Sequence, residues 1–131
     1  MIYLLDVNAL VALGFLNHEF HARVAAWARS QNPPKLATCS ITELGFDRVL
    51  AHAPAYGFTV AQARTLLLRL KSARSVTFTF IADDHDISDL PAWVRAPKQI
   101  TDAHLASLAI ANGAVLATLD ENIPGSNLIP K

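Results

Sequence analysis

The alternation of short apolar runs with longer amphipathic segments is the feature that most constrains the fold of this chain. Short apolar or β-branched runs predict strands over residues 2–5, 35–39, 76–81, 114–117 and 127–129. Between them, apolar residues at helical spacing predict helices over 9–16, 20–30, 41–51, 60–70 and 101–111. Because strands alternate with helices throughout, we expect a single α/β domain over residues 1–131, with a central parallel β-sheet flanked by helices.

Capping and turn residues mark where several of these helices begin and end. Asn8, Thr59 and Thr101 each precede a helical pattern, and we expect each of them to act as an N-cap. The pair Asn112–Gly113 is predicted to end the last helix in a left-handed conformation. Residues 83–98 are polar and contain proline, which predicts irregular structure. After Thr59 the buried stripe is expected at Val60, Ala63, Leu67 and Leu70.

The composition is that of an ordinary globular domain in a reducing compartment. Hydrophobic residues make up 52% of the chain and charged residues 17%, which excludes a disordered protein. The single cysteine, Cys39, excludes a disulfide framework, is expected to be a buried apolar residue, and favours a cytoplasmic location. No run is apolar enough to span a membrane, and the first residues lack a basic leader. Basic and acidic residues number 11 each, so binding to nucleic acid would need a local site.

Four acidic residues are predicted to lie at one edge of the sheet although they are far apart in the sequence. Asp6 directly follows the first strand, and Asp120 follows the strand over 114–117. Glu43 and Asp102 lie in the first turns of the helices over 41–51 and 101–111. In open parallel sheets, ligands bind beyond the carboxyl ends of the strands. We therefore expect these four side chains to share one cleft.

Each acid also has a purely structural explanation. Glu43 and Asp102 could complement helix dipoles, and Asp6 and Asp120 could accept hydrogen bonds from nearby backbone N–H groups. Four carboxylates at one edge would nevertheless repel each other, and a hard divalent cation is the simplest compensation. Mg²⁺ and Mn²⁺ prefer carboxylate oxygens, and no histidine and cysteine set has the spacing of a zinc site. A metal held in this way suits phosphodiester hydrolysis, because it acidifies a bound water and neutralises charge on the phosphate.

The order of these motifs resembles that of PIN-domain ribonucleases, and the compact length resembles the VapC toxins of VapBC-type toxin–antitoxin systems. Asp6-Val7-Asn8 is similar to the opening D-x-N motif of the family, and 40–44 is similar to its second acidic motif. Residues 101–113 resemble the T-D-x-x-L block, and Thr118-Leu119-Asp120 resembles the closing T-x-D. The resemblance spans nearly the whole chain.

The resemblance implies a PIN fold, Mg²⁺- or Mn²⁺-dependent endoribonuclease activity on RNA, a homodimer, and inhibition by a cognate antitoxin protein. Asp6, Asp102 and Asp120 would hold the metal, and Glu43 would bind it or orient the attacking water. The family often has a further acid and a phenylalanine after the closing motif, where this sequence has Asn122 and Ile123. That difference argues against a second metal site. The implied supporting residues are Asn8, which would steer Asp6 by hydrogen bonding, and Thr118, which would act near Asp120.

Two other functions compete with this interpretation. A PIN-fold module without catalysis could bind RNA or protein, although the presence of all four acids argues against it. A receiver or phosphoryl-transfer domain also places an aspartate after its first strand, but it needs a second acid where this chain has Val7 and Asn8. Other conspicuous residues receive less weight. His104 should face away from Asp102, the acids Asp83, Asp84 and Asp86 should form a solvated surface, and Trp27 and Trp93 could lie in the core or contact a partner.

Overall fold

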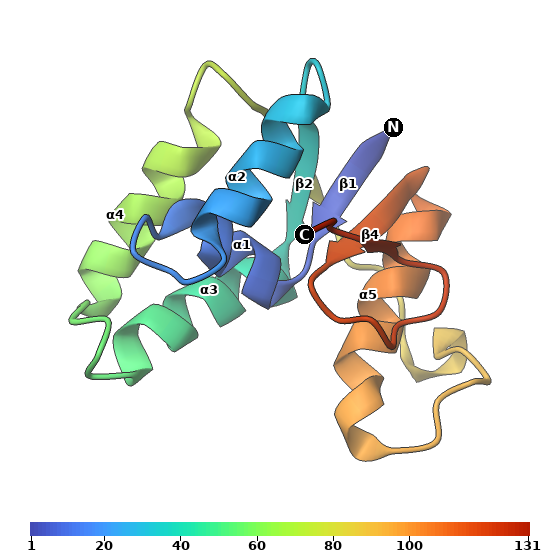
Figure 1. The fold of residues 1–131 in the computed structure, drawn as a ribbon. Coiled ribbons are helices and arrows are strands. Elements are labelled where there is room, and N and C mark those ends of the chain that lie inside the picture. Colours follow the sequence, from blue (N-terminus) through green and yellow to red (C-terminus); the bar gives the residue numbers. More distant parts are fainter.

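The computed structural model describes residues 1–131 as a parallel β-sheet with helices on both faces (Figure 1), which confirms the predicted fold class. Each of the first four strands leads into a helix or follows one directly, as the hydrophobic pattern predicted. In chain order the elements are β1 Ile2–Leu5, α1 Val7–Gly14, α2 His21–Ser30, β2 Lys35–Cys39, α3 Ser40–His52, α4 Val60–Lys71, β3 Thr77–Ile81, α5 Ile100–Ala111, β4 Ala114–Thr118 and β5 Asn127–Leu128.

The sheet has the strand order β3-β2-β1-β4-β5, and every neighbouring pair is parallel. The chain builds the sheet outward from β1 through β2 to β3, and then returns to place β4 on the opposite side of β1. In the register of β1 with β4, Leu5 pairs with Ala117. The strand order therefore reverses between β1 and β4, and in α/β sheets this switch point is where ligands bind.

The two faces of the sheet carry separate hydrophobic cores. Helices α1 to α4 cover one face, and α5 covers the other (Figure 1). Successive residues of β1 alternate between them: Leu4 belongs to the core under α5, and Leu5 to the core under the four helices. Both are fully buried, as expected for a central strand covered on both sides. Because these two side chains are packed into the cores on either side of the sheet, the end of β1 is fixed relative to both layers of helices.

A close approach of α1 and α3 supports the end of β1 from one side. Gly45 of α3 lies against Val7, and a Cβ atom at Gly45 would come within 2.5 Å of Val7 Cγ2. Real Cβ atoms are not found at such distances, so any larger residue would push the two helices apart. Because Val7 immediately follows Asp6, the glycine also helps to set where Asp6 lies.

The helix termini correct two of the predicted caps. Asp6, not Asn8, caps α1: its backbone is extended and its carboxylate accepts a hydrogen bond from the N–H of Ala9. Thr101 lies inside α5, because a 3₁₀ turn over Pro97–Gln99 leads directly into the helix and makes Gln99 its N-cap. The cap at Thr59 is confirmed, since its hydroxyl accepts from the N–H of Gln62. The left-handed end at Gly113 is also confirmed, with a φ of 71°.

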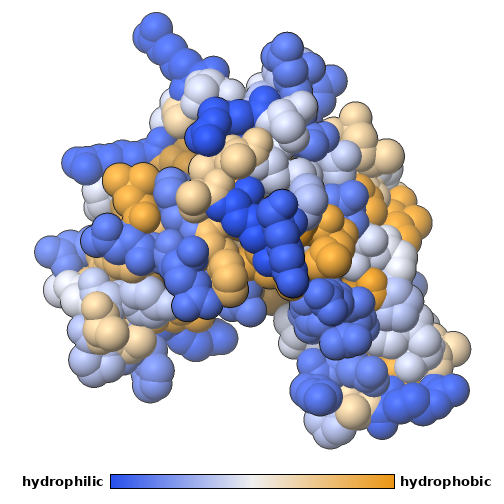
Figure 2. All heavy atoms as spheres, in the orientation of Figure 1, coloured by the Kyte–Doolittle hydropathy of each residue, from blue (hydrophilic) through white to orange (hydrophobic).

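The expected buried stripe of α4 is only partly confirmed. Ala63 and Leu67 are buried and Leu70 is half-buried, but Val60, at the start of α4, is 62% exposed. On the face shown in Figure 2, the hydrophobic side chains form several small patches that are separated by hydrophilic side chains. None of the helices has the length and apolar character needed to cross a membrane. Residues 83–98 are irregular as predicted, apart from 3₁₀ turns over Ile87–Asp89 and Pro97–Gln99.

Candidate active site

The topology brings the ends of four elements to the same edge of the sheet. Asp6 follows β1, and Asp120 lies two residues beyond the end of β4. Glu43 lies in the first turn of α3, which begins where β2 ends. Asp102 lies in the first turn of α5, and α5 runs back along the sheet before β4, so its start lies near the end of β4. All four predicted acids therefore come from the carboxyl edge.

Asp6 is the most deeply buried of these acids, with 6% of its surface exposed. One carboxylate oxygen accepts a hydrogen bond from the N–H of Ala9 at 2.8 Å, and the other accepts one from the hydroxyl of Thr118 at 2.5 Å. Burial, together with the charges of Asp102 and Asp120, raises the pKa of Asp6 to about 6, against the lowering effect of the two hydrogen bonds. Asp6 is thus held in one orientation and is costly to ionise without a cation.

Asp102 and Asp120 complete an electrostatically connected group with Asp6. Burial raises the pKa of Asp102, and the charge of Asp120 adds to the increase. Both side chains line a cleft of about 390 Å³, together with Trp93, Lys98, Gln99, Asn122 and Ile123. Asp120 is positioned locally, because its carboxylate accepts from the N–H of Asn122 at 2.8 Å. The three aspartates therefore act on each other through space, and two of them face a common cleft.

Thr118 connects the two sides of the switch point. Its hydroxyl donates to Asp6 and accepts from the N–H of Asp120 at 3.0 Å. A role near Asp120 was inferred for Thr118 from the family motif, but the bond to Asp6 was not. Asn8, in contrast, makes no hydrogen bond to Asp6, because it is the second residue of α1 and is exposed. The Asp6 carboxylate is instead oriented by the hydroxyl of Thr118 and the N–H of Ala9.

Glu43 has two partners that the sequence analysis missed. The hydroxyl of Thr38 donates to Glu43 Oε2 at 2.6 Å, and Lys71 Nζ lies 2.5 Å from the same oxygen. Lys71 is the last residue of α4, where a basic residue is usually explained by the helix dipole, so nothing in the sequence pointed to this pair. Glu43 is not among the charges that shift the pKa of Asp6. Its negative charge is compensated within the protein.

The donor set of this edge fits a hydrated Mg²⁺ or Mn²⁺ ion. No three carboxylate, histidine or cysteine side chains lie close enough together to enclose an ion directly. Mg²⁺ does not require such a cage, because it usually keeps several waters and binds through one or two carboxylates. The pKa values of Asp6 and Asp102 are raised first by burial and then by neighbouring negative charge, and a bound cation would offset both effects. Asp6, Asp102 and Asp120 are the residues that could hold it.

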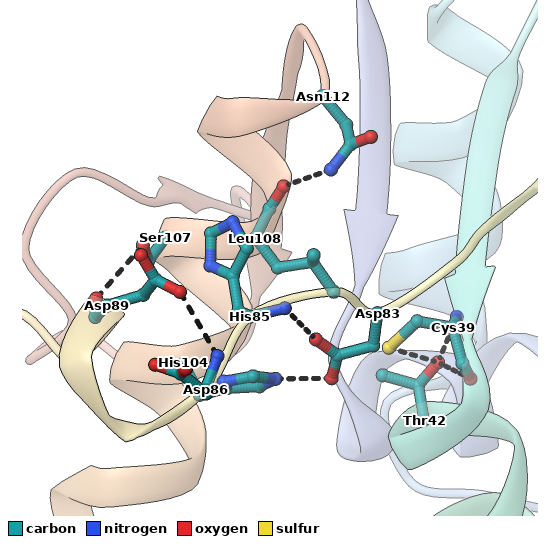
Figure 3. A network of polar contacts seen from close by, with 10 residues as sticks. All are labelled: Cys39, Thr42, Asp83, His85, Asp86, Asp89, His104, Ser107, Leu108 and Asn112. Atoms are coloured by element: carbon teal, nitrogen blue, oxygen red, sulfur yellow. Dashed lines mark hydrogen bonds and ion pairs between the residues drawn. The ribbon is translucent and has the colours of Figure 1, made fainter.

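A second polar network lies on the other side of the start of α5 (Figure 3). His104 Nε2 donates to Asp83 Oδ2 at 2.5 Å, and the N–H of His85 donates to Asp83 Oδ1 at 3.1 Å. Asp83 is exposed, as predicted, but its pairing with His104 was not predicted. Burial opposes ionisation there, but these hydrogen bonds outweigh it and lower the pKa of Asp83. His104 faces away from Asp102, as predicted, because the two lie on different sides of α5.

The two tryptophans, whose places the sequence left open, have different environments. Trp27 is buried in the core under α1 to α4, where it packs edge-on against Tyr3 with ring centroids 5.0 Å apart. Trp93 is partly buried and lines the cleft of Asp102 and Asp120. Cys39 is a free thiol and fully buried, as expected. Of the two tryptophans, only Trp93 can therefore contact a ligand bound in the cleft of Asp102 and Asp120.

Comparison with known proteins finds relatives that match nearly the whole length of this chain. The PIN domain family model matches residues 3–125. Ribonuclease VapC38 from Mycobacterium tuberculosis is 39% identical over 124 residues, which cover 92% of this chain and 86% of that protein. Ribonuclease VapC44 from the same species is 38% identical over 125 residues, covering 92% and 87%.

Two solved structures share the fold at low sequence identity. The crystal structure of Mycobacterium tuberculosis VapC20, described as a Sarcin-Ricin loop cleaving toxin, has a TM-score of 0.64 at 15% identity and covers 94% of this chain and 92% of its own. VapBC2 from Rickettsia felis, bound to a promoter DNA fragment, has a TM-score of 0.58 at 17% identity, with coverages of 98% and 97%. With a family match across nearly its whole length and relatives that are named ribonucleases, this chain belongs to the PIN domain family, among the VapC proteins.

Proposed function

We propose that this protein is a divalent-metal-dependent endoribonuclease and the toxin of a toxin–antitoxin pair. The observation that carries the proposal is the buried Asp6 carboxylate, whose pKa is raised by burial and by the charges of Asp102 and Asp120 at the switch point of the sheet. A site that opposes its own negative charge is suited to bind a cation. The relatives named ribonuclease VapC support RNA as the substrate.

In this proposal Asp6, Asp102 and Asp120 hold Mg²⁺ or Mn²⁺, and Glu43 acts from the same edge of the sheet. The bound metal would acidify a water molecule and neutralise charge developing on the scissile phosphate. The protein's own contribution is positional. Thr118 and the N–H of Ala9 fix both oxygens of Asp6, so the carboxylate is oriented before a ligand arrives.

The charge pair of Glu43 and Lys71 has a separate part in this proposal. Lys71 holds Glu43 through one oxygen, which leaves the other carboxylate oxygen, Oε1, without a partner in the chain. That oxygen is available to accept a hydrogen bond from the attacking water and so orient it toward the phosphorus atom. Glu43 therefore orients water more readily than it binds metal.

The deciding experiment is cleavage of generic single-stranded RNA by the purified protein with added Mn²⁺ or Mg²⁺. Wild-type protein should cut internally, excess chelator should stop it, and added metal should restore it. Asp102→Asn should not cut under any of these conditions, while Asp84→Asn, which changes an exposed carboxylate outside the cleft, should cut like wild type. Cleavage in excess chelator, or by Asp102→Asn, would contradict the mechanism.

The same assay separates this proposal from a catalytically inactive binding module. A protein that binds RNA or a protein partner with high affinity but never cuts, with either metal, would establish the inactive alternative. Neither outcome depends on knowing the natural RNA, because the chemistry requires only a phosphodiester bond within reach of the acidic cleft.

An antitoxin partner and a homodimer belong to the proposal as well. One solved structure of the same fold is a VapBC2 assembly, which supports a protein partner for this chain. A lysine or arginine of such a partner could occupy the acidic cleft in place of the metal. Co-expression with the small protein encoded beside it should give a tight, inactive complex that becomes active when the partner is degraded. A free protein that purifies as a harmless monomer would remove the toxin assignment and leave the nuclease open.

A further inference from the structure

A second, larger cleft opens beside the acidic site, on the other side of Asp120. Its volume is about 670 Å³, which falls in the range of small-molecule pockets. The loop between α1 and α2 supplies half of its lining residues. The lining residues are Asn8, Asn17, His18, Glu19, Phe20, Tyr56, Leu119 and Asp120. Because Asp120 lines both clefts, whatever occupies the larger one lies directly beside the acidic site.

The aromatic part of this cleft is held in place. Phe20 is 38% exposed, although phenylalanine is usually buried. The guanidinium of Arg23 lies 5.8 Å from the centre of its ring, and Arg23 is itself anchored by the carbonyl oxygens of Ile129 and Pro130. The ring of His18 lies 5.9 Å from that of Phe20. Phe20 is therefore an exposed, supported aromatic surface, which is what a nucleobase needs in order to stack.

Two polar side chains of the cleft, Asn8 and Asn17, are unused within the chain. The side-chain amides of Asn8 and Asn17 make no hydrogen bond to any other residue, and each offers both a donor and an acceptor. His18 Nδ1 accepts a hydrogen bond from the N–H of Phe20, so the neutral ring carries its hydrogen on Nε2. Burial lowers the pKa of His18, which favours that neutral form. These groups match the edge of a base, which also presents donors and acceptors side by side.

The charges of the cleft exclude a phosphate and favour a base. No lysine or arginine lines it, and Glu19 and Asp120 would both repel an anion. The Glu19 carboxylate can only accept hydrogen bonds when ionised, so its natural partner is an amino group. Adenine, guanine and cytosine carry an exocyclic amino group, whereas the one edge donor of uracil, its ring N3–H, lies between two carbonyl oxygens that would repel the carboxylate. A base that is paired in a duplex has this edge already occupied and cannot enter.

We propose that this cleft is a nucleobase subsite, which takes an unpaired base with an exocyclic amino group from the nucleotide next to the scissile phosphate. The base stacks on Phe20, and the Asn8 and Asn17 amides and Glu19 bind its edge. This inference rests on the proposed nuclease function and names the substrate feature that the protein selects. It also explains how a protein without net positive charge can select RNA, since the contacts are to a base rather than to the backbone.

The test uses a pool of short single-stranded RNAs of random sequence, cut by wild-type protein and by variants, with sequencing of the new ends. The wild-type cut sites should disfavour uracil at one position next to the cut. Phe20→Ala should lower the rate by about 5- to 150-fold, as loss of one base stack does. Asn17→Ala and Glu19→Gln should keep cleavage but weaken the bias at that position. Leu68→Ala, which removes an exposed apolar side chain on α4, is the matched control and should change neither rate nor bias.

A second measurement does not depend on the folding of any variant. An RNA that wild type cuts at one place is remade with an abasic nucleotide at the biased position, and wild-type cleavage should fall by the same factor as in Phe20→Ala. Full cleavage of the abasic RNA, or an unchanged bias in all three variants, would overturn the subsite while leaving the nuclease intact. If wild-type protein cuts nothing, the proposed function fails instead. Variants that lose only a protein partner, with bias unchanged, would assign the cleft to that partner and overturn the subsite.

Discussion

Thr118 and Asp6 are separated by 112 positions in the sequence, yet the Thr118 hydroxyl donates a hydrogen bond to Asp6 at 2.5 Å. The same hydroxyl accepts from the N–H of Asp120. One side chain therefore joins the acid after β1 to the acid after β4, across the gap where the strand order reverses. The relative position of these two carboxylates depends on this hydroxyl more than on any contact between the acids themselves.

Replacing Thr118 with valine removes the hydroxyl and keeps the shape. Since the hydrogen bond lowers the pKa of Asp6, its loss should raise that pKa and weaken Mn²⁺ binding by about 10- to 100-fold, as for other groups that orient metal ligands. Isothermal titration with Mn²⁺ measures the affinity, and RNA cleavage should fall in parallel. Thr77→Val, at an exposed position of β3, is the control and should leave both unchanged. Wild-type Mn²⁺ affinity in Thr118→Val would show that the hydroxyl is merely structural.

Asp6→Asn should make the metal-free protein more stable, and only above a certain pH. The pKa of Asp6 is about 6 in the fold and 3.8 ordinarily. The folded state therefore binds this proton more tightly than the unfolded state does. Stability is lost as pH rises from 3.8 through 6, and above pH 6 the ionised side chain costs about 3 kcal/mol. Asparagine removes this cost, so the gain should be greatest at neutral pH and absent below 3.8.

Denaturant unfolding of Asp6→Asn and wild type, followed across this pH range in the presence of chelator, measures the effect. Asp84→Asn supplies the control, because its carboxylate is exposed and should give no pH-dependent difference. A destabilised Asp6→Asn at neutral pH would mean that the cap on α1 and the bond from Thr118 outweigh the burial of charge. The same variant should be unable to cleave RNA.

Lys71→Met should increase the affinity of the site for divalent cations. Lys71 neutralises Glu43, and without it this edge of the sheet carries one more uncompensated negative charge. We expect Mn²⁺ to bind up to about tenfold more tightly, the effect of roughly 1.4 kcal/mol of added attraction. Arg69→Met removes a charge from the same turn of α4 without touching Glu43 and should leave the affinity as it is. Weaker Mn²⁺ binding by Lys71→Met would show instead that Lys71 positions Glu43 for the metal.

The products of cleavage should identify water as the nucleophile. If a metal-activated water attacks the phosphorus atom, the ribose 2′-hydroxyl takes no part, and no 2′,3′-cyclic phosphate forms. An RNA with a 2′-O-methyl group at the cut site should therefore still be cleaved. Mass spectrometry of the products distinguishes the two routes. A 2′,3′-cyclic phosphate product would exclude attack by water.

The sequence predicted the parts of this protein that follow from local pattern, and missed those that depend on contacts made across the fold. The parallel sheet and the placement of Asp6, Glu43 and Asp120 followed from where apolar runs end, because a strand's last residue fixes which edge it reaches. The cap of α1 was misassigned to Asn8, since Asp6 and Asn8 are both good caps and only the end of β1 decides between them.

The hydrogen-bonding partners of Glu43 could not be predicted from the sequence for a different reason. Lys71 lies 28 positions from Glu43, and its approach depends on how α4 packs against α3. A lysine at the end of a helix looks the same in the sequence whether it faces solvent or a carboxylate. The bond between His104 and Asp83 was missed for the same reason, since the path of residues 83–98 has no periodic pattern from which it could be derived.

The position of β1 in the middle of the sheet has a consequence for the protein while it is being made. Asp6 leaves the ribosome 112 residues before its hydroxyl partner Thr118, and β1 has no neighbour on that side of the sheet until β4 is added. A nascent or truncated chain that stops before Ala114 therefore has only part of the cleft. A nuclease arranged in this way completes its acidic site only after β4 has been synthesised and paired with β1.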